Sequence, residues 1–177
     1  TVARELLGTY LIRRIGHEQL IGKIVEVEAY IGEDDPACHA SRGKTNRTAL
    51  MFGPPGYAYI YFIYGMYYCL NAVTEAEGFP AAVLIRAVQP IAGIEKMKKL
   101  RKNSRLHQLT NGPGKLCQAF ALDKGLNGVD LCSGEVFISA GEAVSTAHIS
   151  VSSRIGIREG KDAPWRFYIK DNAFLSK

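Results

Sequence analysis

Residues 57–73 have the sequence YAYIYFIYGMYYCLNAV, and this stretch is the strongest indication of the fold. Its two parts, 57–63 and 66–73, are rich in aromatic and β-branched residues, which favour strands. Between them lies Tyr64-Gly65, the kind of X-Gly pair that joins two antiparallel strands. We therefore expect a β-hairpin with Tyr64 at its tip.

The rest of the chain adds strands and a few helices to this hairpin. Its apolar patterns predict strands at 9–14, 20–31, 81–88, 134–139, 148–152 and 165–169. They also predict helices at 2–7, near 91–100, and from Pro113 onward, where proline suits the first helical turn. Strands and helices do not alternate regularly, and no repeat or linker divides the chain, so we expect one α+β domain over residues 1–177.

Six of the nine tyrosines fall within residues 57–68. Tyr57, Tyr59 and Tyr61 share one face of their strand. An aromatic core would account for Tyr57 and Tyr67, but not for a ring at the hairpin tip, where exposure costs hydrophobic free energy. Tyrosines along one face together with a projecting aromatic wedge suit a protein that unstacks a nucleic-acid base and holds it.

The sequence IVEVEAY at residues 24–30 predicts a strand with Glu26, Glu28 and Tyr30 on one face and apolar residues on the other. One interpretation is an edge strand with a solvated carboxylate face. Another is a partly buried carboxylate beside an aromatic ring, an environment that tunes a general acid or base. Two carboxylates at this spacing would also suit a carbohydrate glycosidase.

Arg86 lies inside the apolar run VLIRAV at 83–88. An unpaired buried charge is costly, so Arg86 needs an anionic partner, either a carboxylate such as Glu28 or a phosphate, and its role is structural or catalytic. His39 lies in a loop and by itself indicates nothing more than a surface histidine. The four cysteines and four histidines lack the spacing of a metal site, so we expect no metal and free thiols.

The composition indicates a globular protein with a polyanionic partner. Of the 177 residues 47% are apolar and 22% are charged, which excludes a disordered chain. Residues 91–177 carry 14 basic against 8 acidic residues, whereas residues 1–90 carry 8 against 9. A basic half favours nucleic acid or a membrane surface as partner, or is simply a solvated face. Because no apolar run is long enough to span a bilayer and the start does not resemble a secretory signal, we expect an intracellular protein without a membrane partner.

Nine motifs occur in a characteristic order: EVEAY (26–30), His39, MFGPPG (51–56), YIYFIYGM (59–66), CLN (69–71), LIRA (84–87), NGPGKLCQA (111–119), RIGI (154–157) and WRFYI (165–169). With these motifs the chain resembles the alkyladenine (3-methyladenine) DNA glycosylase family. The resemblance extends from Ala3 to Ser176. Each motif alone is a weak indication, whereas nine in order are specific.

The resemblance implies a base-excision repair enzyme. Such an enzyme flips a damaged purine nucleotide, alkylated or deaminated, out of duplex DNA and hydrolyses its N-glycosidic bond. It leaves an abasic site and does not cut the strand. The resemblance further implies a single domain with a curved, mostly antiparallel sheet, flanking helices and a protruding β-hairpin. It implies no metal or other cofactor, a monomer on double-stranded DNA, and action at DNA in the cytoplasm of a bacterium or the nucleus of a eukaryote.

On the same resemblance Glu28 is the general base for the attacking water, and Arg86 and the main chain near Ile155 hold that water. Two other classes of function stay open from the residues alone. A carbohydrate glycosidase would use Glu26 with Glu28, although the basic half and Tyr64 argue against it. A nucleic-acid-binding module without chemistry would leave Glu28 without a purpose, because a carboxylate repels phosphate.

The resemblance also assigns the residues that bind the substrate. Tyr30, His39 and Tyr61 form the base pocket, and Asn71 at its floor would clash with the 2-amino group of guanine.

Three further residues are assigned to DNA. Tyr64 is the wedge that fills the vacated stack from the minor groove, and Met66 and Lys115 contact DNA. Lys115 lies at the start of a predicted helix, where backbone N–H groups add to its attraction for phosphate. The basic segment 96–105 is either a second phosphate contact or a solvated helix face.

Overall fold

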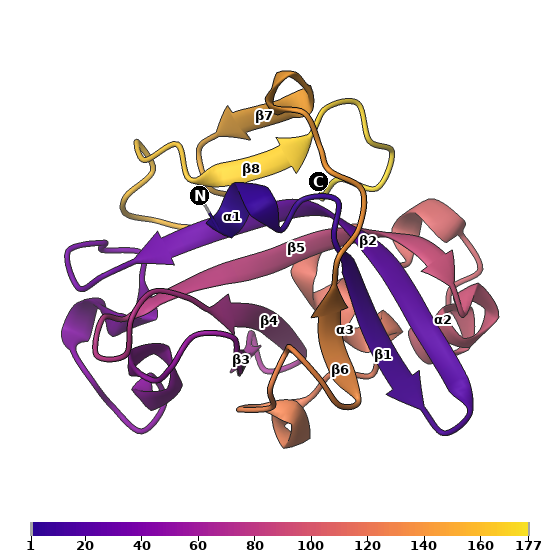
Figure 1. Ribbon diagram of the computed structural model, residues 1–177, viewed down its shortest axis with the longest axis horizontal. Coiled ribbons are helices and arrows are strands. Elements are labelled where there is room, and N and C mark those ends of the chain that lie inside the picture. Colours follow the sequence, from indigo (N-terminus) through magenta and orange to yellow (C-terminus); the bar gives the residue numbers. More distant parts are fainter. Residues whose placement is uncertain (1, 177) are drawn as a thin grey trace.

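An antiparallel sheet of eight strands forms the body of the protein, whose residues 2–176 are described by a computed structural model (Figure 1). The hydrogen-bonded order is β3-β4-β5-β2-β1-β6, and β8 pairs with both β2 and β7. The strands are β1 (Tyr10–Ile15), β2 (Glu18–Ile31), β3 (Ala58–Ile63), β4 (Tyr67–Val73), β5 (Ala81–Ala92), β6 (Val136–Ser139), β7 (Ile149–Ser152) and β8 (Arg166–Ile169).

The helices are few and short. They are α1 (Val2–Glu5), α2 (Ile94–Arg101) and α3 (Pro113–Ala119), with 3₁₀ turns at His39–Arg42, Ala49–Phe52, Leu106–Gln108, Lys124–Leu126 and Thr146–His148. Helix α3 begins at Pro113, as the sequence predicts, and packs against β4 and β5, while α2 packs against α3. Among residues 2–176 no helix has the length and hydrophobicity that crossing a bilayer requires.

Strand β2 is the centre of the sheet. Its early residues pair with β1, residues 26–28 pair with β8, and β5 runs along its other edge. Strong twist along these long strands curls the sheet into a half-barrel, with β7 and β8 above β2 in the view of Figure 1. The expected α+β class, the single domain and the curved antiparallel sheet with its β3–β4 hairpin are confirmed. The edge-strand interpretation of residues 24–30 is wrong, because β2 has neighbours on both sides.

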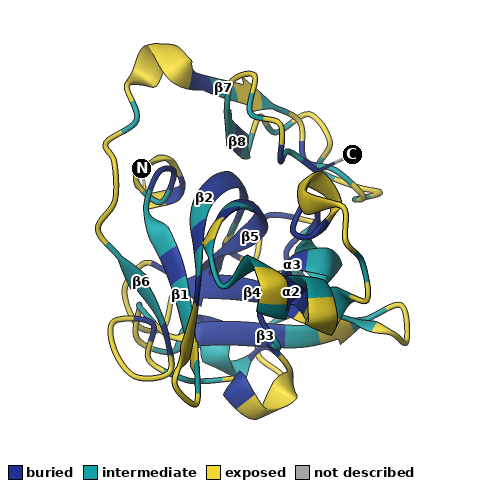
Figure 2. Ribbon diagram, turned by 90° about the vertical axis from the view of Figure 1, so that its right-hand side faces the viewer, coloured by how far each residue is buried: buried dark blue, intermediate teal, exposed yellow. Residues whose placement is uncertain are grey.

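The main hydrophobic core lies between the sheet and helices α2 and α3. Leu20 and Ile24 of β2, Ile85 of β5, Met97 of α2 and Phe120 after α3 are completely buried within it. Figure 2 shows this burial as dark blue along β2 and β5. A smaller apolar cluster, which includes Met51, Tyr59 and Val73, joins the loop after β2 to β3 and β4. These two clusters support the strands and loops that carry the residues predicted for the site.

The β3–β4 hairpin differs in detail from the sequence prediction. Ile63 pairs with Tyr67, so three residues form its loop and β4 begins at Tyr67 rather than at residue 66. Tyr64 and Gly65 both have a positive φ, 55° and 68°, a conformation that costs free energy for tyrosine but not for glycine. Tyr57 precedes β3 and is 37% exposed, so an aromatic core does not account for this residue.

Three register shifts interrupt the pairing of β2 with β5, one at Ile21 and two beside Glu26. The register shifts on either side of Glu26, which leaves Val25 of β2 and Arg86 of β5 without an opposite residue in this described pair of strands. A bulge redirects its side chain and is common beside active sites. Here it lets Arg86 reach both Glu26 and Glu28. Val25 departs from the predicted alternation for the same reason, and it packs on Phe174 rather than in the main core.

A buried ion pair fixes the loop that follows β7. Arg154 donates from its two terminal nitrogens to both carboxylate oxygens of Asp35, at 2.6 and 2.8 Å. Both side chains are almost completely buried. Arg154 also donates to the carbonyl of Ala29 at 3.0 Å and lies over the rings of Tyr30 and Trp165. The loop is therefore tied to the end of β2.

Replacement of Asp35 by asparagine should lower the free energy of unfolding by about 3 kcal/mol, because the buried charge of Arg154 loses its counter-ion. Urea unfolding followed by circular dichroism measures this loss. The matched control is Glu142→Gln, which removes an exposed carboxylate that pairs with Lys23 and should change stability by no more than about 0.5 kcal/mol. Equal effects of the two variants would contradict the structural role of the buried pair.

Candidate active site

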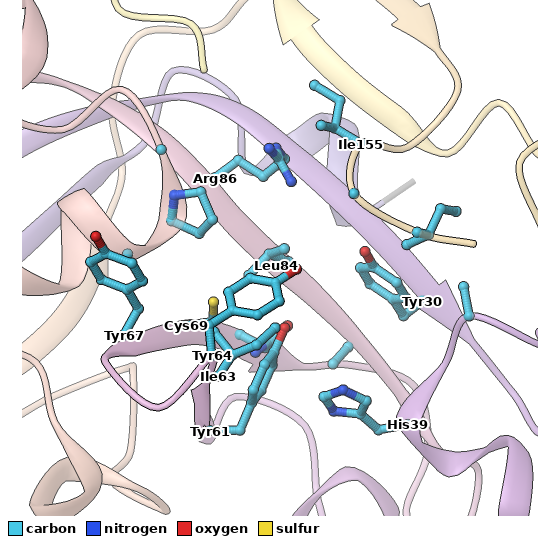
Figure 3. A pocket seen from close by; sticks show the side chains of 18 of the residues that line it. Tyr30, His39, Tyr61, Ile63, Tyr64, Tyr67, Cys69, Leu84, Arg86 and Ile155 are labelled. Carbon is cyan, nitrogen blue, oxygen red and sulfur yellow. The ribbon is translucent and has the colours of Figure 1, made fainter. Parts of the chain in front are cut away.

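A cavity of about 620 Å³ opens between the β3–β4 hairpin, strand β5, the start of α3 and the loops that follow β2 and β7 (Figure 3). Eight of the ten residues predicted for the site line it: Tyr30, His39, Tyr61, Tyr64, Asn71, Arg86, Lys115 and Ile155. The other two do not. Glu28 lies behind the wall, completely buried, and Met66 is exposed at the hairpin tip.

Aromatic rings dominate one end of the cavity. The ring of His39 lies 4.4 Å from that of Tyr61 at an angle of 75°, and its Nδ1 is 3.0 Å from the hydroxyl of Tyr59. Tyr30 stands on the other side of the cavity in the view of Figure 3. Strand alternation brings Tyr59 and Tyr61 here from β3, while the turn at His39–Arg42 supplies the histidine. We call Tyr30, His39 and Tyr61 the aromatic slot.

The aromatic slot carries no charge near neutral pH. Burial, assisted by the positive charge of Arg47, lowers the pKa of His39 to about 4, so its imidazole is neutral. Burial raises the pKa of Tyr30, with a further contribution from the negative charge of Glu28. Burial likewise raises the pKa of Tyr61. A flat ring entering the slot therefore meets neutral aromatic faces.

Asn71 lies on β4 beside the slot, where it is 4% exposed. Its side-chain nitrogen donates to the carbonyl of Tyr59 at 3.0 Å, which fixes the amide in one orientation. Asn71 and the neighbouring Cys69 both line the cavity. A fixed amide at this position presents a defined donor and acceptor pattern to whatever enters.

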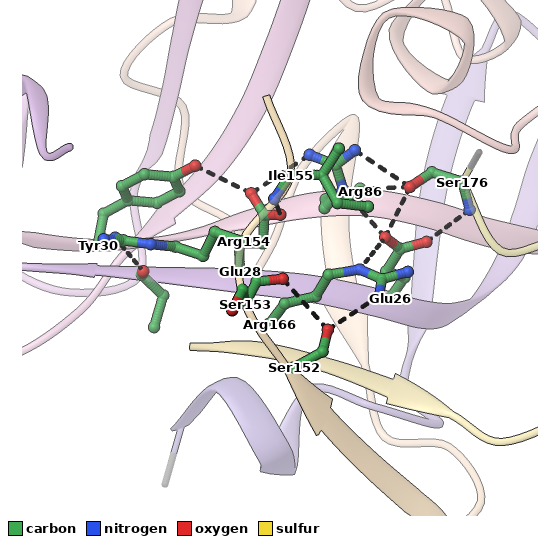
Figure 4. Close-up of polar contacts among 11 residues, drawn as sticks. Glu26, Glu28, Tyr30, Arg86, Ser152, Ser153, Arg154, Ile155, Arg166 and Ser176 are labelled. Atoms are coloured by element: carbon green, nitrogen blue, oxygen red, sulfur yellow. Dashed lines mark hydrogen bonds and ion pairs between the residues drawn. The ribbon is translucent and has the colours of Figure 1, made fainter. Parts of the chain in front are cut away.

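Glu28 is held by three donors that all belong to the cavity wall (Figure 4). Its Oε2 accepts from the hydroxyl of Tyr30 at 2.9 Å and from Nη1 of Arg86 at 3.3 Å. Its Oε1 accepts from the backbone N–H of Ile155 at 2.7 Å. The main chain near Ile155 therefore binds Glu28 itself, a contact that sequence reasoning missed. The loop tied down by Arg154 delivers this N–H group.

Glu26 is the more heavily bonded of the two carboxylates. Its Oε1 accepts from Nε of Arg86 at 3.0 Å, from Nε of Arg166 at 2.8 Å and from the hydroxyl of Ser176 at 2.6 Å. Its Oε2 accepts from the backbone N–H of Ser176 at 2.6 Å. Burial opposes the charge on Arg86, but the carboxylates of Glu28 and Glu26 outweigh it and raise the pKa of the guanidinium. The negative charges of the two carboxylates are thus balanced by the positive charges of Arg86 and Arg166.

The predicted partner of Arg86 was a single anion, Glu28 or a phosphate, and the structure supplies Glu28 and Glu26 together. The shared face of Glu26, Glu28 and Tyr30 is confirmed, since the first two bond Arg86 and the third bonds Glu28. Ser176 also lines the cavity and was missed, because nothing in the sequence around it indicates that the segment after β8 returns to the site.

The residues predicted to touch DNA lie at or near the opening of the cavity. Tyr64 is 76% exposed and Met66 is 60% exposed, both at the tip of the β3–β4 hairpin. Lys115 stands at the start of α3, where its ammonium group donates to the side chain of Asn111 at 2.9 Å. Gly114 allows α3 to approach the hairpin, because a side chain there would lie within 2.8 Å of the ring of Tyr67.

The site offers no cluster of metal ligands within residues 2–176. The four cysteines are free thiols, of which Cys38, Cys69 and Cys117 are buried. The chemistry available in this part of the chain is that of a buried carboxylate paired with arginine beside an aromatic cavity. Such a combination is suited to a hydrolase that binds a planar ring and attacks next to it with water.

The chain belongs to the methylpurine-DNA glycosylase family. Its residues 1–173 match the family described as Methylpurine-DNA glycosylase (MPG). The family resemblance seen in the sequence is thereby confirmed. Membership supports DNA glycosylase activity, in which hydrolysis of the N-glycosidic bond releases methylated purines from DNA during repair.

Similar proteins occur in several organisms and are named as candidate 3-methyladenine DNA glycosylases. The protein from Carboxydothermus hydrogenoformans is 54% identical over 177 residues, which cover 99% of this chain and 92% of the relative. That from Methanocella arvoryzae is 53% identical over 181 residues, 99% and 90% of the two chains. The protein from Legionella pneumophila (strain Lens) is 50% identical over 179 residues, which cover 99% of this chain and 91% of the relative.

The neutral state of His39 can be tested by nuclear magnetic resonance. The imidazole proton signals of His39 should titrate with a midpoint near pH 4, far below the ordinary value of 6.5. Protonation therefore favours the unfolded chain, and the stability that His39 contributes is lost as the pH falls from 6.5 towards 4. Arg47→Gln should raise the midpoint but leave it below 6.5, since burial is the larger cause. A midpoint near 6.5 in the native protein would contradict the burial of the ring.

Proposed function

We propose that the protein flips a damaged purine nucleotide out of duplex DNA and hydrolyses its N-glycosidic bond with a water molecule activated by Glu28. One observation carries this proposal: the three donors that hold the buried Glu28, namely Tyr30, Arg86 and Ile155, all line the aromatic cavity. A base seated in the aromatic slot would bring its sugar to the wall behind which Glu28 lies. The carboxylate can then act on a water next to C1′.

The hydrogen bonds distinguish the two carboxylates. A carboxylate can accept about four hydrogen bonds. Glu26 accepts four from the described residues, three at Oε1 and one at Oε2. Glu28 accepts three, of which one is at Oε1. Oε1 of Glu28 can therefore accept a further bond from the attacking water. We assign the role of base to Glu28 and a structural role to Glu26, which argues against a carbohydrate glycosidase that would use both.

The proposed reaction is a simple displacement. The water oxygen bonds to C1′ of the sugar while its proton passes to Glu28. The bond between C1′ and the purine nitrogen breaks, and its electron pair leaves with the base. A methylated purine that carries a positive charge thus departs as a neutral base. The negative charge of Glu28 also stabilises the oxocarbenium-like sugar in the transition state.

The aromatic slot favours this substrate. A cationic purine is attracted to the faces of Tyr30 and Tyr61, and a neutral His39 does not repel it. Stacking on aromatic side chains replaces part of the stacking that the base loses when it leaves the duplex. We extend the proposal to deaminated purines such as hypoxanthine, which carry no positive charge and must gain a proton on the ring to leave as a neutral base. Asn71 would exclude guanine by a clash with its 2-amino group.

The hairpin tip supplies the contacts with duplex DNA. Tyr64 holds a costly backbone conformation and a largely exposed ring, a combination that is typical of a functional position. We propose that it fills the space left by the flipped nucleotide from the minor groove. Met66 lies beside it, and Lys115 at the start of α3 contacts a phosphate.

We further propose that the enzyme is monofunctional, works as a monomer without a cofactor, and acts on DNA inside the cell. No amine is needed for the displacement described above, so the product is an abasic site in an uncut strand. The compartment would be the cytoplasm in a bacterium or the nucleus in a eukaryote.

Glu28→Gln tests the assignment of the base. The amide keeps the shape of the side chain but neither accepts the proton nor carries the charge, so single-turnover excision of a purine from duplex DNA should fall by about a thousandfold or more. Binding of lesion DNA, measured by fluorescence anisotropy, should stay within about tenfold, since Glu28 lies behind the cavity wall.

The matched control is Glu26→Gln. It should unfold more easily, because Arg86 and Arg166 lose part of a buried counter-ion, yet the folded protein should still excise the base. An active Glu28→Gln variant beside a folded but inactive Glu26→Gln variant would reverse the assignment.

Tyr64→Ser tests the wedge. Thermal unfolding should barely change, because Tyr64 is 76% exposed. Duplex DNA with a single 1,N6-ethenoadenine should bind more weakly, and the fluorescence that reports the flipped base should decrease, since the wedge offsets an unstacking cost of a few kcal/mol.

Phe62→Ser, an exposed aromatic residue on the same hairpin, is the control and should leave the fluorescence unchanged. A large drop in melting temperature with normal flipping would make Tyr64 a structural residue instead.

A further inference from the structure

We infer that Ser176, in the segment that follows β8, is a positioning residue of the active site: its hydroxyl fixes the guanidinium of Arg86 between Glu26 and Glu28. The inference rests on the proposed role of Glu28. Ser176 is remote in sequence from every other residue of the site, and it meets them only because the segment folds back over β2 and β5.

The segment that carries Ser176 is firmly seated. Phe174 is 7% exposed and packs on Val25 and Ala87. Asn172 donates from its side chain to Gln89 of β5 at 3.1 Å and accepts from the backbone of Phe174 at 2.9 Å. The bulge that turns Val25 away from the main core therefore provides the apolar contact that holds this segment. Ser176 is thus delivered to the carboxylates in a fixed position.

The hydroxyl of Ser176 lies at the junction of the buried charges (Figure 4). It donates to Oε1 of Glu26 at 2.6 Å and accepts from Arg86, from Nε at 3.2 Å and from Nη2 at 3.1 Å. The residue is 8% exposed and lines the cavity. The hydroxyl of Ser176 therefore connects Glu26 with Arg86, the arginine that in turn holds Glu28.

This geometry determines where the guanidinium points. Nη1 of Arg86 bonds Glu28, whereas Nη2 bonds Ser176 among the described residues. Without the hydroxyl, Nη2 would be a buried donor with its bond broken, and the guanidinium would turn to satisfy it. Any such rotation moves Nη1 away from Glu28 and changes the orientation of the carboxylate that must meet the water. A displacement of about 1 Å in a catalytic group can slow a reaction by two orders of magnitude.

Ser176→Ala tests the inference. Single-turnover excision of 1,N6-ethenoadenine from a duplex should slow by about tenfold, the effect of one hydrogen bond to a charged group. The dissociation constant for the same DNA should stay within about twofold, because the hydroxyl acts on the chemical step rather than on binding. Ser176→Thr restores the hydroxyl and should recover most of the rate.

The matched control is Ser152→Ala. It removes a hydroxyl that accepts from Arg166, the other arginine on Glu26, and does not touch Arg86. Its excision rate should equal that of the native protein. The melting temperature of each variant is measured first, and excision is then assayed well below it. A difference in excision rate therefore does not come from a loss of folded protein.

A double-mutant cycle with Arg86→Lys completes the test. A lysine has no Nη2 to be held, so Ser176→Ala should have little further effect in that background. The same tenfold loss in both backgrounds, or native excision by Ser176→Ala, would overturn the inference. If Glu28→Gln remains inactive while Ser176→Ala is fully active, the proposed function stands and only the role of Ser176 fails; an active Glu28→Gln variant would remove the proposed function itself.

Discussion

Strand β2 carries two completely buried carboxylates, and the segments around it are arranged to neutralise their charge. Glu26 and Glu28 are fully excluded from solvent, and an ionised carboxylate in such a place is costly unless cations and hydrogen-bond donors surround it. Several neighbouring segments contribute these groups. The bulge in β5 turns Arg86 towards both carboxylates, and β8 supplies Arg166. The loop after β7 supplies the N–H of Ile155, and the segment after β8 supplies the N–H and hydroxyl of Ser176. The sheet curls so that these distant segments meet at β2.

The same requirement underlies the different roles that we propose for the two carboxylates. Glu26 accepts four hydrogen bonds from the described residues and contacts both Arg86 and Arg166, which supports the structural role that we propose for it. Glu28 shares one of these arginines and faces the wall of the cavity with an oxygen that can still accept a bond. The adjoining slot is aromatic and neutral, which suits a positively charged purine. A DNA glycosylase of methylated purines thus appears as the consequence of one buried charge cluster placed next to a ring-binding cavity.

The sequence allowed most of the fold to be predicted, because strong local patterns dominate it. The tyrosine-rich hairpin, the strand of residues 24–30 and the helix that starts at Pro113 all follow from spacing and turn chemistry. The bulges at Val25 and Arg86 could not be predicted, since they depend on how two strands twist against each other rather than on either strand alone. Two features of the site could also be predicted. The alternation in IVEVEAY places Glu28 and Tyr30 on one face, and the apolar run around Arg86 implies that this residue has an anionic partner. The contributions of Ser176 and of the Ile155 N–H come from long-range chain folding, for which no local pattern exists.

In the proposed reaction water, and not an amine of the protein, displaces the base. The most direct measurement uses a duplex with a single hypoxanthine or 1,N6-ethenoadenine, incubated with the protein and divided into three portions: untreated, treated with alkali, and treated with borohydride. We predict release of the free base, an intact strand before alkali, a break at the lesion after alkali, and no protein–DNA adduct with borohydride. A strand cut without alkali, or a covalent adduct trapped by borohydride, would show that an amine of the protein attacks in place of water.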